Sequence, residues 1–456
     1  MTTLPAQHRW PPTQRRGSVL IVAIVLVFTL ASVTLALCRS MRVEIIASAN
    51  HAAILQASAI EHGAEQYLLA VLTEESSDLS GLTEDYFAAV PVGDGYFWIL
   101  RPDYGDSFMP VFGMIDESAK LNLNTATYDQ LMMLPCMTDD VATAIIDWRD
   151  EDSDLTQGGA ENEYYLSLAD PYYCKNAPFE SVEELLLVRG TLWELLYGEG
   201  QPLPMGSASL FSMSGSSMLD DVWLRRGIYD LLTIYSNEPS TSSSGGQKIS
   251  LTDPNQRSQL RDLLRTQLGS SRGDQAANAL GSGPLRDIFD LYFQAQLTAD
   301  ELALITDSVT SGGSARGRIN VNTAPREILL TLDGLDTSDV DKLVSQRRSL
   351  TTTQSTSIAW VADALGQKAV GLGNRITGRG YQYAAYVLAV SGNGRAFKQV
   401  RVVIDASGTT PQIVYRRDIT DRGWLMEPEI LASLRAGEGL GMWSGVSGSA
   451  LGGSLR

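Results

Sequence analysis

The first 75 residues combine a long uncharged stretch with a helical pattern. Residues 18–38 carry no charge and directly follow Arg15, Arg16 and Gly17. At about 1.5 Å per residue, a helix of that length spans about 30 Å, the thickness of the hydrocarbon core of a membrane. Apolar residues continue at helical spacing beyond this stretch. We therefore predict one helix over residues 18–75 that begins in a membrane and continues outside it.

Runs of β-branched and aromatic residues predict two groups of strands that lie far apart in the chain. The first group lies in residues 76–117 and the second in residues 376–417. Asn393 and Gly394 separate two runs of the second group. They predict a hairpin with a type I′ turn, because both residues accept a positive φ. Together the two groups predict one antiparallel sheet that is interrupted by an insertion over residues 118–375.

The run AFKQVRVVI in the second group alternates apolar and polar side chains. Val400, Val402 and Ile404 lie on one face of this predicted strand, and Gln399 and Arg401 lie on the other. Such alternation is typical of an antiparallel strand with one buried and one solvated face.

The insertion has mainly helical patterns and contains a phrase that occurs three times. KLNLNTAT begins at Lys120, recurs as RINVNTAP at Arg318, and recurs more weakly as KISLTDPN at Lys248. Each phrase precedes a helical pattern, and its Asn or Thr side chain can cap the helix that follows. We predict helix-hairpin-helix-like repeats near residues 119–150, 247–265 and 317–349.

The end of the chain is rich in glycine and serine. Its glycines follow no strand and open no helix, so we predict a flexible tail over residues 418–456. The fold class predicted for the whole chain is α+β. It consists of a long N-terminal helix, an antiparallel sheet and a large, mostly helical insertion.

The charge of the chain argues against DNA as the ligand of the repeats. The chain has 53 acidic and 35 basic residues, a net charge of −18, and a polyanion is bound by placing Lys and Arg on its phosphates. A DNA-binding hairpin also presents glycine N–H groups to phosphate, whereas the first copy has no glycine there and carries Asp139 and Asp140. We interpret the repeats as packing modules and predict no nucleic-acid binding. The alternative is a membrane-anchored DNA-uptake receptor.

The distribution of histidine argues against an enzyme. His8, His51 and His62 all lie within the first 62 residues. The rest of the chain therefore cannot build a histidine-based zinc site or a Ser-His-Asp triad. A periplasmic hydrolase that uses carboxylates alone is a third and weaker alternative.

An acidic loop follows the first repeat. Seven carboxylates face a single arginine there: Asp147, Asp150, Glu151, Asp152, Asp154, Glu161 and Glu163. Aspartates alternate from position 150 to 154, and Glu161 is at position twelve counted from Asp150, which is the ligand pattern of an EF-hand loop. Leu155 stands where that loop needs glycine, which argues against a true EF-hand. A solvated acidic loop is the alternative to a cation site.

Two of the three cysteines lie in the predicted insertion. Cys38 ends the apolar stretch, whereas Cys136 and Cys174 belong to the insertion. Cys136 and Cys174 could form a disulfide in an oxidising compartment. Three unrelated thiols are the alternative.

The amino terminus resembles that of type IV pilin-like precursors. A basic leader over residues 1–17, an apolar stretch and an amphipathic continuation occur in that order. The resemblance implies that a prepilin peptidase cuts after Gly17 and methylates the new amino terminus at Ser18. The alternatives are an ordinary membrane anchor and a cleavable signal peptide, whose apolar region is usually shorter than this one.

The fifth residue after the implied cleavage site is Val22. Most pilin-like proteins carry Glu there, where it neutralises the terminal amine of a neighbouring subunit inside the membrane. An uncompensated charge in lipid costs several kcal/mol. The missing carboxylate therefore suits a subunit that never lies below another one, at the tip of a filament.

The segment after the first repeat is similar to the signature of the type II secretion system minor pseudopilin K family. An acidic loop, Gly-Gly-Ala-Glu, paired tyrosines, a Pro-Tyr and a Ser-Val-x-Glu-Leu-x-x-Val-x-Gly phrase occur in that order in residues 145–190. With the leader, the repeats and the terminal strands, the resemblance covers most of the chain. It departs in residues 191–317, where the insertion is longer than the family pattern.

The resemblance implies a pilin-like fold and a non-catalytic role in the export of folded proteins across the outer membrane. It implies a single-pass protein in the inner membrane, with its bulk in the periplasm. Its implied partners at the pseudopilus tip are the minor pseudopilins I and J and other pseudopilus subunits, and its implied role is to initiate or cap assembly. Family members bind calcium in this region, which implies Ca²⁺ on the loop carboxylates Asp147, Asp150, Asp152, Asp154, Glu161 and Glu163.

Overall fold

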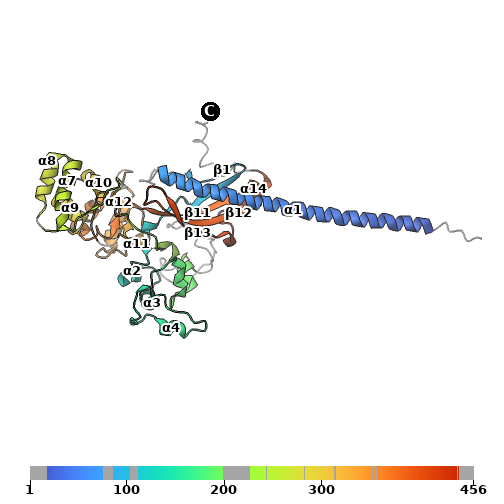
Figure 1. Ribbon diagram of the computed structural model, residues 1–456, viewed down its shortest axis with the longest axis horizontal. Coiled ribbons are helices and arrows are strands. Elements are labelled where there is room, and N and C mark those ends of the chain that lie inside the picture. The colour runs from blue at the N-terminus through green and yellow to red at the C-terminus, as the bar shows by residue number, and fades with distance from the viewer. Residues whose placement is uncertain are drawn as a thin grey trace, which may run out of the picture.

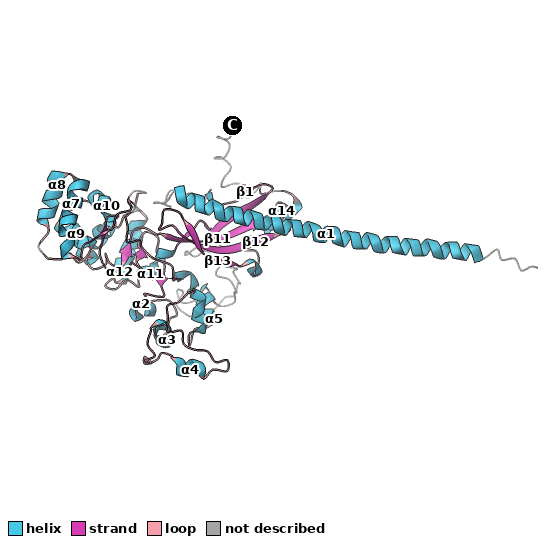
Figure 2. Ribbon diagram, in the orientation of Figure 1, coloured by secondary structure: helices cyan, strands magenta, loops and turns pink. Residues whose placement is uncertain are grey.

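In the computed structural model, a long helix lies across an antiparallel sheet, and a mostly helical domain extends from the sheet (Figure 1). The structure describes residues 18–74, 86–102, 111–198, 226–242, 244–281, 283–312, 315–351, 354, 357–438 and 440. The sheet lies against α1, and the inserted part is built mainly from short helices and loops (Figure 2). The predicted α+β fold class is confirmed.

Helix α1, Ser18–Glu74, has two halves with different surroundings. Its N-terminal half projects beyond the rest of the molecule, with exposed apolar side chains (Figure 1). In its C-terminal half, Ile60, Ala64, Leu68 and Leu72 recur at every fourth position and pack on the sheet. Among the described residues, one helix is long and apolar enough to cross a membrane, and it is this one.

The sheet joins strands from both ends of the chain. Its order is β1-β2-β11-β12-β13, with β3 on β2 and β4 on β11. Every neighbouring pair is antiparallel, and Ile99 of β2 lies opposite Val387 of β11. The strands are β1 Val90–Val92, β2 Gly95–Arg101, β3 Val111–Phe112, β4 Ile115–Asp116, β11 Gln382–Val390, β12 Phe397–Asp405 and β13 Gln412–Asp418.

The inserted part leaves and re-enters the sheet at neighbouring points. Strand β4 ends at Asp116, and β11 begins at Gln382. In the register of these two strands, Asp116 lies opposite Tyr383. The two ends of the insertion are therefore held side by side by strand pairing.

Strand β12 differs from its prediction on one face. Val400, Val402 and Ile404 pack on the side of α1, as their alternation indicates. The opposite face is not solvated, because Gln399 is 0% and Arg401 4% exposed. Elements outside the predicted sheet cover this face, so the prediction of a half-buried strand is wrong.

One of the covering elements lies in the predicted tail. Helix α14, Pro428–Ala436, follows the short helix η9, Thr420–Arg422. Ile430, Leu431 and Leu434 of α14 are buried in one cluster with residues of β2, β11 and β12. The prediction of a flexible tail is therefore wrong for residues 418–438 and 440, and residues 441–456 lie outside the described residues.

The hairpin between β11 and β12 forms, but with a different turn. Val390 pairs with Phe397, so residues 391–396 make the connection. Gly394 has a φ of +61°, whereas Asn393 is not among the described residues with positive φ. The Asn393 Oδ1 atom instead accepts hydrogen bonds from the Arg395 N–H at 3.1 Å and the Ser391 hydroxyl at 2.9 Å. The predicted type I′ turn is therefore wrong.

The three repeated phrases share a local architecture. Each begins with a two-residue strand that pairs in parallel with a strand distant in sequence. The pairs are β5 Leu121–Asn122 with β6 Leu232–Thr233, β7 Ile249–Ser250 with β8 Val309–Thr310, and β9 Ile319–Asn320 with β10 Ile376–Thr377. The helices that follow are α2 Tyr128–Met132 and α3 Asp139–Arg149, then η6 Pro254–Gln256 and α7 Arg257–Leu268, then α11 Arg326–Leu329 and α12 Thr337–Arg347.

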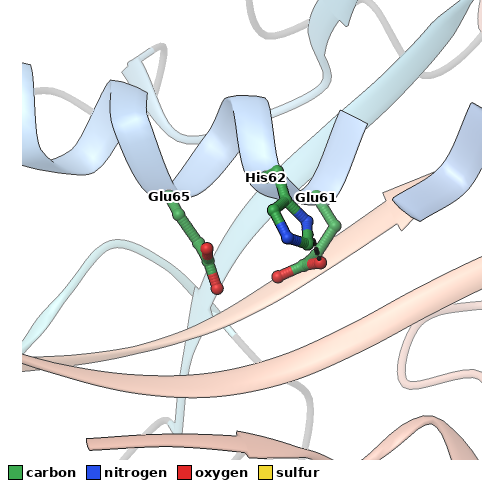
Figure 3. A group of neighbouring side chains, drawn as sticks. All are labelled: Glu61, His62 and Glu65. Atoms are coloured by element: carbon green, nitrogen blue, oxygen red, sulfur yellow. Dashed lines mark ion pairs between the residues drawn. The ribbon is translucent and has the colours of Figure 1, made fainter. Parts of the chain in front are cut away.

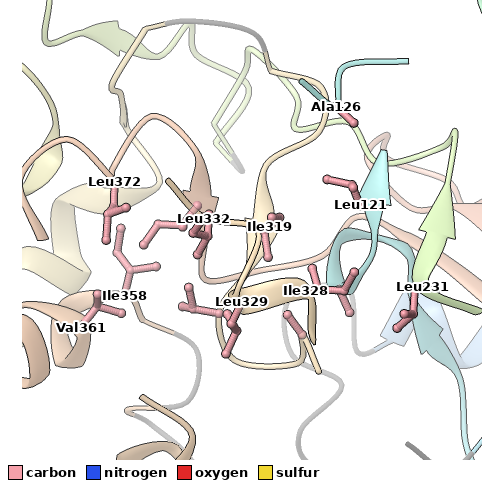
Figure 4. Packing of buried hydrophobic residues seen from close by; sticks show 14 of the residues in the cluster. Leu121, Ala126, Leu231, Ile319, Ile328, Leu329, Leu332, Ile358, Val361 and Leu372 are labelled. Carbon is pink, nitrogen blue, oxygen red and sulfur yellow. The ribbon is translucent and has the colours of Figure 1, made fainter. Parts of the chain in front are cut away.

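One hydrophobic core joins the three copies. Leu121 of the first copy, and Leu231 just before its partner strand β6, belong to the same buried cluster as Ile319 and Ile328 of the last copy (Figure 4). Leu260 and Leu264 of the middle copy belong to it as well. The other described helices of the insertion are η3 Glu117–Ala119, α4 Asn162–Leu166, η4 Val182–Leu187, α5 Trp193–Tyr197, η5 Tyr229–Leu231, α8 Ser270–Ala279, α9 Ile288–Gln294, α10 Ala299–Thr306, α13 Ala359–Leu365 and η8 Gly366–Ala369.

Candidate functional site

The asparagines of the repeated phrase fold its loop. Asn122 Oδ1 accepts a hydrogen bond from the Asn124 N–H at 2.9 Å, and Asn320 Oδ1 accepts one from the Asn322 N–H at 3.0 Å. The second asparagine then reaches another segment. Asn124 exchanges two hydrogen bonds with the backbone of Phe179, at 2.7 and 3.0 Å. The phrase is thus a turn that ties distant parts of the chain together.

An arginine at the end of the second helix braces each of these loops. Arg149 of α3 donates to the carbonyl oxygens of Leu123 and Ala126. Arg347 of α12 donates to the equivalent carbonyl oxygens of Val321 and Ala324, at 3.1 and 2.6 Å. Burial lowers the pKa of both arginines. Their guanidinium groups are therefore used inside the protein rather than offered to a phosphate.

The helix ends where a phosphate would bind carry acidic side chains. Asp139 and Asp140 lie in the first turn of α3. Asp336 caps α12, and Asp339 lies in its first turn. These carboxylates oppose an anion at a helix N-terminus. The absence of nucleic-acid binding stays a prediction, and the geometry favours the interpretation of the repeats as packing modules.

The predicted processing site lies at the start of α1. Gly17 lies outside the described residues, and Ser18 is the first residue of the helix. Val22 is exposed on the projecting half of α1. Cleavage after Gly17 and methylation of Ser18 stay predictions.

The acidic loop gathers carboxylates at the ends of two helices. Asp147 lies near the end of α3 and is fully buried, and Asp150 is the residue at the C-terminal cap of that helix. Glu161 is buried and caps the N-terminus of α4. One oxygen of each of these three carboxylates, and the side-chain oxygen of Asn176, is buried and has no hydrogen-bond partner. Buried oxygens of this kind are costly unless a cation or another donor satisfies them.

The carboxylates raise one another's pKa. Burial, followed by the charges of Asp152, Asp147 and Glu161, raises the pKa of Asp150 to about 6. Burial and the charges of Asp147 and Asp152 also raise the pKa of Glu161. The acidic loop therefore concentrates more negative charge than the neighbouring side chains of the protein neutralise.

Two glycines let the loop close on Asp147. A side-chain carbon added to Gly159 would lie 2.0 Å from Asp147 Oδ2, and Gly158 has a φ of +93°. Arg189 Nη1 donates hydrogen bonds to the carbonyl oxygen of Gly158 at 3.4 Å and to that of Gly159 at 2.6 Å. Arg189 belongs to the Val-x-Gly phrase of the sequence signature, so that phrase holds the acidic loop in place.

An aromatic cluster supports the loop from the inside. The ring of Tyr165 is fully buried, and its centroid lies 5.1 Å from that of Trp148 and 5.3 Å from that of Tyr172. The Tyr165 hydroxyl accepts a hydrogen bond from the Arg189 N–H at 3.2 Å. Of the paired tyrosines of the signature, Tyr165 is therefore part of the core beneath the acidic loop, whereas Tyr164 is 37% exposed.

The structure brings together some of the predicted ligands but not all. Asp147, Asp150 and Glu161 are electrostatic neighbours, and Asp152 is close enough to shift the pKa of two of them. Among the described residues, however, no three of these carboxylates place oxygens within 4.8 Å of one another. The remaining two predicted ligands, Asp154 and Glu163, are exposed and are not among the main electrostatic neighbours of this group.

Sequence reasoning missed Asn176. Its Nδ2 group donates to the carbonyl oxygen of Asp152 and, at 3.2 Å, to the hydroxyl of Ser153. It comes from a later loop and has a φ of +45°. Its spacing from the acidic run follows no ligand pattern, so the sequence held no signal for it.

The side-chain atoms that this group could offer to a cation are all oxygens, the ligand type that calcium prefers. Ca²⁺ accepts six to eight carboxylate, amide, backbone and water oxygens in flexible geometry, and a nitrogen or sulfur ligand is not needed. Three carboxylates, a neighbouring fourth and an amide oxygen suit this ion better than Zn²⁺, which prefers histidine and cysteine.

The thiol of Cys174 lies behind the acidic loop. Its Sγ atom is 3.7 Å from the carbonyl oxygen of Asp147, and burial raises the pKa of this thiol to about 11. Cys174 is not disulfide-bonded in the structure, so the disulfide considered with Cys136 is not formed there.

Comparison with known proteins gives one family match. Residues 116–196 match the model of the family described as type II secretion system (T2SS), protein K. The matched segment begins where the chain leaves the sheet. It contains the first repeat, the acidic loop, the aromatic cluster and Arg189. No curated protein sequence matches the chain.

Among solved structures, the chain is similar to one described as the crystal structure of the GspK-GspI-GspJ complex from the type 2 secretion system of enterotoxigenic Escherichia coli. The sequence identity is 13%, the alignment covers 80% of this chain and 96% of that chain, and the TM-score is 0.41. A TM-score this low adds no argument, so the assignment rests on the family match. The chain therefore carries a domain of the type II secretion system protein K family.

Proposed function

We propose that the chain is a minor pseudopilin that lies at the tip of a type II secretion pseudopilus, beside the minor pseudopilins I and J. There it helps to initiate or cap assembly for the export of folded proteins. Its role is structural rather than enzymatic. The observation that carries the proposal is the protein K domain, inserted into a sheet that a single membrane-length helix crosses.

The shape of the molecule supports a place at the tip. The insertion extends well beyond the sheet and α1 (Figure 1). Subunits in the shaft of a filament stack closely, and a domain of this size would collide with the subunit above. At the tip no subunit lies above it. Val22, in place of the usual glutamate, supports the same place, because a tip subunit needs no carboxylate for a neighbour's amine.

Membrane location and processing belong to the same proposal. The exposed apolar half of α1 anchors the chain in the inner membrane, with the sheet and the insertion in the periplasm. Prepilin peptidase removes residues 1–17 and methylates Ser18. Intact mass and amino-terminal sequencing of membrane-extracted protein should give a methylated Ser18. A start at Met1, or just after Cys38, would contradict the proposal.

Calcium binding is the second part of the proposal. Asp147, Asp150 and Glu161, with Asp152 nearby and the amide oxygen of Asn176, would hold Ca²⁺. The ion would supply the positive charge that the buried oxygens lack, and it would fix the loop against the aromatic cluster. Its binding free energy would add to the stability of the folded insertion.

Labelling of assembled filaments tests the place in the pseudopilus. The full-length chain, expressed with the pseudopilins of its own system, is labelled with antibodies against the insertion. Label should occur at one end of each filament, and the chain should co-purify with the I and J subunits after detergent extraction. Label distributed along the shaft would rule out the tip.

A further inference from the structure

A second cluster of possible metal ligands lies on α1, outside the protein K domain. Glu61, His62 and Glu65 each contribute one ligand atom, and these atoms lie within 4.8 Å of one another (Figure 3). Among the described residues, no other such group of histidine, cysteine and carboxylate side chains is found. The cluster follows the membrane-length half of α1 and lies where the helix crosses the sheet.

The two glutamates point at the sheet and the histidine lies at its margin. Glu61 and Glu65 are four residues apart on one face of the helix and are 0% and 6% exposed. The His62 side chain is 64% exposed. One side of the cluster is therefore buried and fixed, and the other is open to solvent.

Arg416 of β13 fixes the glutamates but leaves one oxygen free. Its Nη2 atom lies 2.8 Å from Glu61 Oε1, and its Nε atom lies 2.5 Å from Glu65 Oε1. The other oxygen of Glu61, Oε2, is buried without a hydrogen-bond partner. That oxygen faces the ring of His62, with Nδ1 2.9 Å away. His62 Nδ1 also lies 2.9 Å from the carbonyl oxygen of Ser58, which can only accept a hydrogen bond. Nδ1 therefore carries the hydrogen, and Nε2 is the ring nitrogen that can accept a metal ion.

The charge of the cluster favours a further cation. Two carboxylates and one guanidinium leave a net charge of about −1 when the imidazole is neutral. A cation bound by the carboxylates and by Nε2 of the imidazole would offset this charge.

We propose that Glu61, His62 and Glu65 form a binding site for a divalent transition-metal ion such as Zn²⁺. An imidazole nitrogen with carboxylate oxygens suits Zn²⁺ and related ions rather than Ca²⁺ or Mg²⁺, which prefer oxygen alone. Water completes the coordination on the open side of His62. This site is distinct from the all-oxygen acidic loop, and its ligands lie within five consecutive residues of one helix.

Calorimetric titration of the full-length protein in detergent with ZnCl₂ tests the site. Millimolar Ca²⁺ is present throughout, so that the acidic loop is saturated. Wild-type protein should bind Zn²⁺, and His62→Ala should weaken this binding about 10-fold or more. His62 is exposed, so this change leaves the fold intact. His51→Ala removes another exposed histidine of α1 and should bind as the wild type does. Equal affinity in wild type and His62→Ala would overturn the proposal.

Cobalt substitution identifies the ligand type. Co²⁺ bound to imidazole and carboxylates gives weak visible bands, whereas thiolate ligands add a strong charge-transfer band in the near ultraviolet. The weak bands should appear in wild type and His51→Ala and be lost in His62→Ala. A thiolate band, or weak bands that His62→Ala leaves unchanged, would place the ion elsewhere and overturn the proposal.

Discussion

The first and last copies of the repeat share a framework but treat their buried carboxylates in opposite ways. In the last copy, Asp339 is buried and lies 2.7 Å from Lys368 Nζ and 3.4 Å from Lys342 Nζ, and its pKa is lowered mainly by Lys368. In the first copy, Asp147 is buried with one oxygen unsatisfied, and the pKa of Asp150 is raised to about 6.

The two copies therefore share their backbone framework but differ in how their buried carboxylates are neutralised. The short strand, the asparagine turn and the arginine brace are the same in both copies. In the last copy, lysine supplies the positive charge from within the chain. In the first copy, the proposed Ca²⁺ would supply that charge from outside the chain. The framework therefore has a structural role, and the proposed cation binding belongs to the acidic loop that follows the first copy.

Removal of the arginine brace should have the largest effect and should be similar in the two copies. Arg149→Met or Arg347→Met would leave two backbone carbonyl groups unsatisfied in a buried loop, at a cost of about 2–4 kcal/mol each. Hydrogen exchange of the full-length protein, with calcium at saturation, should show faster exchange around the altered copy. A large effect in one copy and none in the other would show that the framework is not shared.

Calcium should stabilise only the first copy. At a free concentration of one hundred times Kd, a single bound ion stabilises the folded state by about 2.7 kcal/mol. EGTA should therefore lower the melting temperature, and Asp147→Asn should abolish this dependence. Asp339→Asn, the same change at a buried carboxylate in the first turn of α12, should leave it intact. Identical melting curves in EGTA and in millimolar Ca²⁺ would show that the loop binds no calcium.

The two copies should respond to pH with opposite signs when calcium is absent. The pKa of Asp150 is raised to about 6, above its usual value of about 4. Its contribution to stability is full below about pH 4 and is lost as the pH rises through about 6. The pKa of Asp339 is lowered. Its contribution is present above about pH 4 and is lost at lower pH.

Measurement of the unfolding free energy of the calcium-free protein as a function of pH tests these opposite signs. Asp150→Asn should flatten the decline between about pH 4 and pH 6. Asp339→Asn should leave that decline unchanged and remove a loss of stability below about pH 4. Added calcium should also flatten the decline, because it favours the ionised carboxylate. A calcium-free profile that Asp150→Asn does not change would contradict the assignment.

The smallest effect is expected for Lys368→Met. The lysine side chain is 56% exposed, and exposed ion pairs contribute about 0–1 kcal/mol. The variant should raise the pKa of Asp339 toward its ordinary value, which NMR titration of the carboxyl group measures. An unchanged pKa would show that Lys342 alone neutralises this carboxylate.

The sequence predicted those features that depend on local pattern. Runs of β-branched and aromatic residues identified the strands β2, β11 and β12. Their separation in the chain predicted the interrupted sheet that the register of Ile99 and Val387 shows. The repeated asparagine phrase marked equivalent turns. Within the acidic loop, the carboxylates that raise one another's pKa were among the predicted ligands.

Features that depend on contacts between distant segments were missed. Helix α14 covers the face of β12 that carries Arg401, although the short apolar spacing of Ile430, Leu431 and Leu434 was present in a segment dominated by glycine. Asn176 comes from a later loop and reaches the acidic loop through its hydrogen bond to the carbonyl oxygen of Asp152. Neither arrangement follows from the residues beside it in the sequence.

The side-by-side attachment of the insertion has a mechanical consequence. A force directed along α1 is transmitted to the sheet where Ile60, Leu68 and Leu72 pack and where Arg416 holds Glu61. The insertion is joined through Asp116 and Gln382, on paired strands, so the direct path from helix to sheet bypasses it. Helix α1 and the sheet therefore transmit the force together. The inserted domain lies outside this path of force, so a change in its length does not alter the contact between α1 and the sheet.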